Sequence, residues 1–239
     1  MYRGSTGGTS LGTFTSSIAS NNWHFIEVHA KVDPSAGIFE VWLDNTQKIN
    51  LTSVNTRNNG SATGISIFSP GSYPNGSNKY YIDDLYINDT TGSAPMNGRL
   101  GDSRVYTSVP TSDAAPNNGA LSTGATHWGV VDEVHFNTTD YTDLTNTAAQ
   151  GEYFGQNSAL ISGQTVFAVK VTAVLEKTDA GAASGKVGIK SSSTYAYGPT
   201  YNLSTSWALT SKVFETDPNT SSQWGYAAVN AAVVGFEVV

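Results

Sequence analysis

The sequence predicts an all-β protein: an antiparallel β-sandwich or jelly roll, followed by a second β-sandwich with one short C-terminal helix. Ser, Thr and Asn make up 75 of the 239 residues, and these residues suit turns and the solvent faces of strands better than helix interiors. Charged residues make up only 13%, against roughly 25% in an average globular domain. Short stretches of alternating apolar and polar residues recur between Gly-, Pro-, Asn- and Asp-containing turns, which is the pattern of β-strands.

The clearest early element is a hairpin with strands at residues 23–32 and 38–44. A turn at residues 33–37, which contains Asp, Pro and Gly, joins the two strands. Alternation places Val41 and Leu43 on the core face of the second strand, with Trp42 on the other face. In the first strand, one face carries Ile26, Val28, Ala30 and Val32, and the other carries Glu27, His29 and Lys31. Further strands are predicted at residues 48–54, 64–68 and 80–87, and they complete a first domain of residues 1–95.

The second domain, residues 96–239, is less regular. Residues 88–101 are predicted to form a linker or a crossover, and residues 110–127 a long loop. The strongest strand pattern of the chain lies at residues 164–177, where both faces are apolar; such a strand is central in a sheet or lies at an interface. Other strands are predicted at residues 128–136, 187–190, 194–203, 207–214 and 236–239, and a helix at residues 223–232 follows a capping region at residues 217–222.

Composition excludes several functional classes. The formal net charge is −7, and the 12 Lys and Arg residues are scattered, which argues against binding of nucleic acid. No apolar run approaches the roughly 20 residues of a membrane span, and the first residues lack the pattern of a secretory signal. Cysteine is absent, which excludes disulfides and thiolate metal sites and suits a protein that folds in a reducing cytoplasm.

Three blocks of sequence resemble a family of bacteriophage virion proteins, in which a concanavalin A-like (laminin-G-like) jelly roll precedes a second β-rich region. The first block is Trp23-His24-Phe25-Ile26-Glu27-Val28 with Gly37 to Asn45. The second is Ile82-Asp83-Asp84-Leu85-Tyr86, continued by Asn88-Asp89-Thr90-Thr91-Gly92 and by Leu100 to Val105. The third comprises Val131-Asp132-Glu133, Thr139-Asp140-Tyr141, Thr216-Asp217-Pro218, Trp224, Val229-Asn230 and Gly235.

The resemblance implies a non-enzymatic structural protein of the virion, made in the host cytoplasm and located in a tail, a fibre or the head surface. It supplies no catalytic residues. Its expected partners are other virion subunits and further copies of the same chain. Residues 1–87 offer fewer strands than a full jelly roll of this class needs. Either the unit is shortened or a neighbouring subunit completes its sheets, since open sheet edges invite pairing.

The residues themselves show no catalytic set. Glycoside hydrolysis needs two carboxylates across a cleft, and Glu40 to Asp44 lacks the E-x-D-x-x-E spacing of jelly-roll glycanases. The adjacent residues Asp132 and Glu133 point to opposite faces of a strand. The four histidines, His24, His29, His127 and His135, show no metal-binding spacing.

Calcium is the one cofactor for which the sequence offers candidate ligands, because Asp83-Asp84 and the carboxylates of residues 140–143 supply hard oxygen atoms. No EF-hand pattern is present, and turn capping or solvation of a strand edge explains the same residues.

Aromatic side chains support an alternative function, a carbohydrate-binding module for adsorption to a host-surface glycan. The candidate glycan-binding residues are Trp42, Tyr73 and Tyr80, and Tyr195, Tyr197 and Tyr201 also lie in or near predicted loops. Tyr and Trp are equally typical of protein interfaces. For a virion protein, packing at an interface is the favoured role of these side chains.

Overall fold

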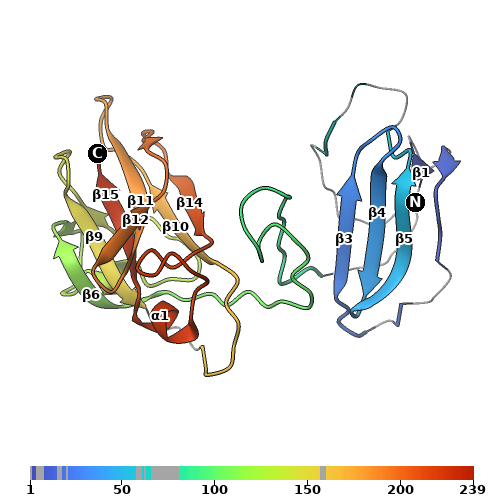
Figure 1. The fold of residues 1–239 in the computed structure, drawn as a ribbon. Helices are drawn as coiled ribbons and strands as arrows, with labels where there is room; N and C mark the ends of the chain where they lie inside the picture. Colours follow the sequence, from blue (N-terminus) through green and yellow to red (C-terminus); the bar gives the residue numbers. More distant parts are fainter. Residues whose placement is uncertain are drawn as a thin grey trace. The chain divides into compact units, whose positions relative to one another are not determined.

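The computed structural model describes residues 2–3, 8–14, 18–19, 21–57, 61, 63–65, 81–156 and 160–239. In this part of the chain, short strands form several antiparallel sheets, accompanied by one α-helix and one 3-10 helix (Figure 1). The predicted all-β fold class is confirmed. The chain divides into two compact units, residues 1–105 and 106–239, whereas the sequence placed the boundary between residues 95 and 96.

The first unit is built on a three-stranded antiparallel sheet in the order β3 (Ile26–Lys31), β4 (Gly37–Leu43) and β5 (Thr46–Val54). The predicted hairpin and its third strand are therefore confirmed. Asp44 and Asn45 form the two-residue turn between β4 and β5, with φ of +50° and +62°, a conformation that Asp and Asn tolerate well. A separate two-stranded ladder pairs β1 (Tyr2–Arg3) with β2 (Thr9–Ser10).

The strand predicted at residues 80–87 is wrong for residues 81–87, which form no strand in the described part of the chain. Asp84 instead adopts a left-handed φ of +52°, and its carboxylate accepts a 2.7 Å hydrogen bond from the Val105 amide. This segment is thus held by a side-chain hydrogen bond, and not by the backbone hydrogen bonds of a β-ladder. Gly64 and Ile65 also lie outside strands, and residues 66–80 lie outside the described residues.

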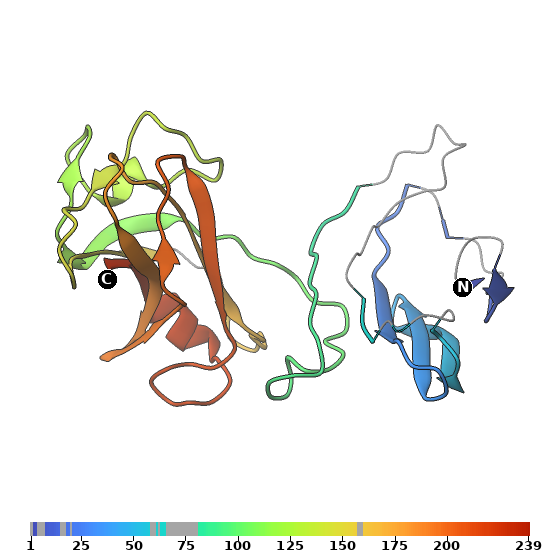
Figure 2. The ribbon, with the colours of Figure 1, turned by 90° about the horizontal axis from the view of Figure 1, so that it is seen from above.

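The second unit contains a six-stranded antiparallel sheet in the order β12-β11-β15-β9-β6, with β13 also paired to β11 (Figures 1 and 2). A second sheet pairs β10 with β14, and α1 adds a short helix. The strands are β6 (Pro110–Asn117), β9 (Gly151–Gln156), β10 (Val169–Leu175), β11 (Ser184–Ser191), β12 (Thr194–Tyr197), β13 (Tyr201–Asn202), β14 (Ala208–Phe214) and β15 (Val233–Val238), and the helix is α1 (Tyr226–Ala231).

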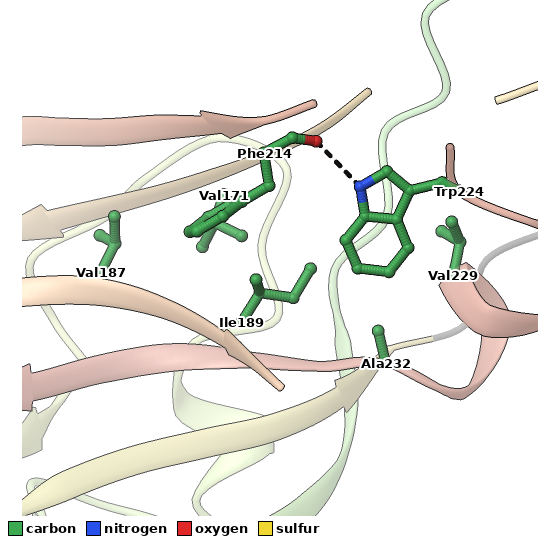
Figure 3. Close-up of a cluster of buried hydrophobic side chains, with 7 residues drawn as sticks. All are labelled: Val171, Val187, Ile189, Phe214, Trp224, Val229 and Ala232. Atoms are coloured by element: carbon green, nitrogen blue, oxygen red, sulfur yellow. Dashed lines mark hydrogen bonds between the residues drawn. The ribbon is translucent and has the colours of Figure 1, made fainter. Parts of the chain in front are cut away.

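The hydrophobic core of the second unit lies between the six-stranded sheet, the β10–β14 sheet and α1. Val187 and Ile189, alternate residues of β11, are completely buried. They belong to a cluster with Val171 of β10 and Phe214 of β14 (Figure 3). The same cluster contains Trp224, Val229 and Ala232, and the Trp224 indole N–H donates a 2.9 Å hydrogen bond to the Phe214 carbonyl. Because β11 alternates, its Lys186, Gly188 and Lys190 lie on the opposite, outer face of the sheet.

Several sequence predictions for the second unit are wrong. The predicted loop at residues 110–127 contains β6 and β7 (Ala120–Leu121), which pairs with β8 (Thr142–Asp143). The predicted strand at residues 128–136 begins instead with a 3-10 helix, Trp128–Val130, and its remainder forms no strand. The strongest strand pattern corresponds to β10, which pairs with β14 alone among the described strands. Of the two predicted positions, central in a sheet or at an interface, the central one is wrong.

Other predictions for this unit are confirmed. Strands β11, β12, β14 and β15 and the helix overlap their predicted ranges, although β11 and β15 each begin three residues earlier than predicted and β12 ends at Tyr197. The predicted capping region at residues 217–222 does not cap the helix, because its N-cap is Gly225 and no side chain caps it. Tyr195 and Tyr197 are on β12 and Tyr201 is on β13, rather than in loops. No helix in the described residues is both long and apolar enough to cross a membrane.

Candidate functional site

Trp42, the first predicted glycan-binding residue, lies on β4 on the face opposite to buried Val41 and Leu43. Its ring is half-buried, because the Arg99 guanidinium carbon lies 4.7 Å from the ring centroid. A cation over a Trp ring is held by the quadrupole of the ring. Trp42 is therefore partnered within the first unit. Tyr73 and Tyr80, the other two predicted residues, lie outside the described residues.

Arg99 is held in turn by Glu27, a buried carboxylate on β3. The Arg99 Nε atom lies 2.5 Å from a Glu27 carboxylate oxygen. The other Glu27 oxygen accepts hydrogen bonds from the Tyr86 hydroxyl and from the amides of Leu100 and Gly101. Burial and the bond to Glu27 raise the pKa of Tyr86 well above its usual range. A buried carboxylate needs such partners, and these partners bind Tyr86 and the predicted linker, residues 88–101, to the sheet.

The edge strand β3 is the other notable feature of this unit, because it exposes apolar side chains. Ile26 is 54% exposed and Val28 47% exposed. Their register partners on β4, Leu43 and Val41, are only 7% and 9% exposed. Directly paired residues of an antiparallel ladder point to the same face, so the apolar face is covered at β4 and open at β3.

The β3 edge, defined here as β3 with the side chains of Ile26 and Val28, is our candidate assembly surface. On its other side β3 pairs with no strand in the described part of the chain. Unpaired backbone groups and exposed branched side chains together form a template for an additional strand. The sequence predicted the alternation on β3 but not that this apolar face would remain exposed.

Asp84, one of the predicted calcium ligands, has other partners in the structure. Asp84 binds the Val105 amide and the Arg104 guanidinium, at 2.7 and 3.1 Å. The Val105 hydrogen bond, followed by Arg104, lowers the pKa of this carboxyl. Asp143 lies on β8. In the residues that the structure describes, no three His, Cys, Asp or Glu side chains are grouped so as to hold a metal ion.

A second buried carboxylate, Glu152 on β9, was missed by the sequence analysis. Its side chain is 3% exposed; it accepts a hydrogen bond from the Gly119 amide, and the His127 Nδ1 atom lies 3.1 Å away. These bonds hold the connection after β6 and the segment before the 3-10 helix against β9. The Asp113 carboxylate also accepts a 2.7 Å hydrogen bond from the Trp128 amide, so the cluster links β6, β9 and the 3-10 helix.

Comparison with known proteins gives no relative: no protein-family model, no curated protein and no solved structure matches this chain.

Proposed function

We propose that this chain is a non-enzymatic structural protein of a bacteriophage particle, a component of the tail, a fibre or the head surface. The proposal is supported by the resemblance of its three sequence blocks to virion proteins. The observation that carries it is the β3 edge, on which Ile26 and Val28 remain about half exposed beside buried Val41 and Leu43. The chain assembles with further copies of itself or with other virion subunits by adding strands at such edges.

Strand addition at the β3 edge supplies two kinds of stabilisation. Backbone N–H and C=O groups of β3 gain partners in the added strand. Burial of the exposed halves of Ile26 and Val28 contributes about 1 kcal/mol for each side chain. Many subunits bound through the same edge make a stable particle from individually modest contacts.

The mass of the full chain in solution, measured by light scattering over a range of concentrations, tests self-assembly. We expect a closed oligomer, whose mass is a multiple of the 25.2 kDa chain. Val28→Lys places a charge on the exposed edge and should shift the mass toward the monomer. Val105→Lys is the matched control, because Val105 is 58% exposed but lies outside any strand; it should leave the mass unchanged.

A monomer at every concentration, or an oligomer that Val28→Lys leaves intact, would contradict assembly through β3.

The place of the protein in a particle needs a separate measurement. Mass spectrometry of purified particles of the phage that encodes the chain should find it in stoichiometric amount; its absence would contradict the virion role.

Glycan binding is the second candidate function. It is favoured by a pair of parallel tyrosine rings on β12, Tyr195 and Tyr197. Trp42, whose ring contacts Arg99, and Tyr73 and Tyr80 stay predictions for the same function in the first unit.

A further inference from the structure

The outer face of the six-stranded sheet carries two parallel tyrosine rings. Tyr195 and Tyr197 are two residues apart on β12 and therefore point to the same side. Their ring planes differ by 5° and their centroids are 6.0 Å apart. Both residues are partly exposed. The negative face of an aromatic ring attracts the weakly positive C–H groups that line one side of a pyranose.

Contacts beneath and beside these rings fix their positions. Tyr153 of β9, which is completely buried, packs edge-on against Tyr195 with centroids 5.4 Å apart. The Tyr197 hydroxyl donates a 2.9 Å hydrogen bond to Glu237 of β15. Burial and this bond raise the pKa of Tyr197 to about 12, so the hydroxyl stays neutral at physiological pH. A surface that is ordered before binding loses less conformational entropy when a ligand binds.

Two lysines of β11 lie against the same rings. The Lys186 ammonium is 3.9 Å from the Tyr197 centroid and 2.9 Å from a Glu237 carboxylate oxygen. The Lys190 ammonium is 5.0 Å from the Tyr195 centroid and has no carboxylate partner among the described residues. Lys190 thus offers N–H donors beside an aromatic face.

An open hollow of about 540 Å³ adjoins Lys190 at the end of the sheet. Its volume lies within the range of ligand-binding pockets, roughly 300–1,000 Å³. The polar side chains that line it include those of Lys190, Ser192, Asp217, Asn219 and Thr220.

The hollow is held in shape by local hydrogen bonds. The Thr194 hydroxyl at the start of β12 lies 3.5 Å from the Asn219 amide oxygen. The Asp217 carboxylate accepts a 2.9 Å hydrogen bond from the Asn219 backbone amide. Hydroxyl, amide and ammonium groups therefore meet here, and they can both donate hydrogen bonds to sugar hydroxyls and accept them. Asp217 itself is buried and contributes its charge and its bond to Asn219.

We propose that the outer face of β11 and β12, with the adjoining hollow, binds a neutral hexose polysaccharide. The exposed part of the Tyr195 ring contacts the apolar face of one sugar, beside Tyr197, whose ring face carries Lys186, and Lys190 and the hollow bind hydroxyl groups of the neighbouring sugar. A neutral ligand fits because charges of both signs are present: Glu237 is paired with Lys186, and Asp217 lies in the same hollow as Lys190. This inference rests on the second candidate function, glycan binding, and is independent of assembly through β3.

Affinity electrophoresis of the full chain tests the proposal, in gels that contain dextran, mannan or galactan as neutral probes and alginate or polygalacturonate as acidic ones. We expect retardation by at least one neutral polymer, followed by calorimetry with oligosaccharides of that polymer. Tyr195→Ala and Lys190→Ala should each weaken binding about tenfold or more, equivalent to at least about 1.4 kcal/mol. Tyr195→Phe, which keeps the ring, should bind within about twofold of the unchanged protein.

Matched controls distinguish binding at this site from nonspecific binding. Tyr81→Ala removes a tyrosine of the first unit that is 77% exposed, and Lys170→Ala removes an exposed lysine of β10; both should bind normally. Circular dichroism checks that each variant is folded. The proposal is overturned if no neutral polymer retards the chain, or if folded Tyr195→Ala and Lys190→Ala bind as well as the controls. It is also overturned if only acidic polymers bind and added salt abolishes that binding. Light scattering on the same samples reports assembly separately.

Discussion

At the scale of single residues, hydrogen bonds between histidine and carboxylate connect segments that are distant in the sequence. The pairs are His24 with Asp44, His29 with Glu40 and His127 with Glu152, at 2.8, 2.8 and 3.1 Å. Asp44 also accepts a 3.0 Å hydrogen bond from the Phe25 amide, so its carboxylate joins the turn after β4 to the residues before β3. The His24–Asp44 pair therefore makes the stability of the start of β3 depend on pH.

We predict that the stabilisation from His24 is greatest in mildly acidic solution. The hydrogen bond to Asp44 raises the pKa of His24 above its ordinary value of 6.5, so this contribution is fully present below pH 6.5 and is lost as the pH rises through the higher folded value. The bonds from His24 and Phe25 lower the pKa of Asp44 below 3.8, so its contribution is lost as the pH falls through that lower value. The stabilising window therefore lies between the two ordinary values.

Thermal melts of His24→Gln should show this window. The variant should melt at a lower temperature than the unchanged protein at pH 5, and the difference should shrink toward pH 8, because the charge of His24 is lost as the pH rises through its raised folded-state pKa. His135→Gln is the control, because His135 is exposed and forms no ion pair among the described residues. An equal loss at both pH values would contradict the role of the charged histidine.

Residues of the core were predictable from the sequence where local alternation decides burial, as for Val41 and Leu43. Glu27 was not, because its burial depends on Tyr86 and Arg99, 59 and 72 residues further along the chain. The same reason explains the unexpected exposure of Val28: its place at an open edge depends on which strands are absent beside β3. The proposed glycan site was only partly predictable, since alternation aligns Tyr195 with Tyr197 but does not reveal the hollow near Lys190.

At the scale of elements, β9 shows why a buried strand escaped prediction. Its sequence, Gly-Glu-Tyr-Phe-Gly-Gln, contains two glycines and a glutamate, which are depleted in strands. The glycine of the neighbouring strand β15, Gly235, pairs with Tyr153 of β9, and Gly188 of β11 lies at the Tyr153 hydroxyl. Gly188 leaves room for the Tyr153 ring, and Gly235 leaves room for the backbone of β9, because glycine has no side chain.

We predict that Gly235→Ala destabilises the second unit by about 3 kcal/mol or more. A Cβ atom at this position would collide with the backbone carbonyl of Glu152 and would lie 2.8 Å from the Tyr153 Cα. Backbone atoms of a central strand cannot move aside without breaking the ladder between β15 and β9. Urea denaturation, followed by the fluorescence of buried Trp224, measures the loss.

Gly225→Ala provides the comparison. Gly225 precedes α1 with a φ of −86°, and an added Cβ would have nothing within 4 Å. Its free energy of unfolding should fall by less than about 1 kcal/mol, the usual range for a residue at a helix N-cap. Equal effects of the two substitutions would contradict the close approach of β15 and β9.

At the scale of the whole molecule, the two units differ in how their cores are built. In the first unit the buried apolar residues described are few, Val41, Leu43 and Ile49 on one sheet. In the second unit the hydrophobic cluster spans both sheets and α1, and every member lies between residues 160 and 234. A core whose members all come from one unit needs no residue of the other unit to form.

We therefore predict that residues 106–239 fold by themselves. The isolated segment should show one cooperative thermal transition, because a domain with its own hydrophobic core unfolds as a unit. The temperature of this transition should equal that of one transition of the full chain. Differential scanning calorimetry on both proteins makes the comparison. We expect the first unit to be stabilised by assembly, since its β3 edge leaves apolar surface uncovered, so its transition should move to higher temperature when the chain is concentrated enough to assemble. A segment of residues 106–239 without a cooperative transition would show that the second unit requires the first. A concentration-independent transition of the first unit would instead contradict assembly through β3.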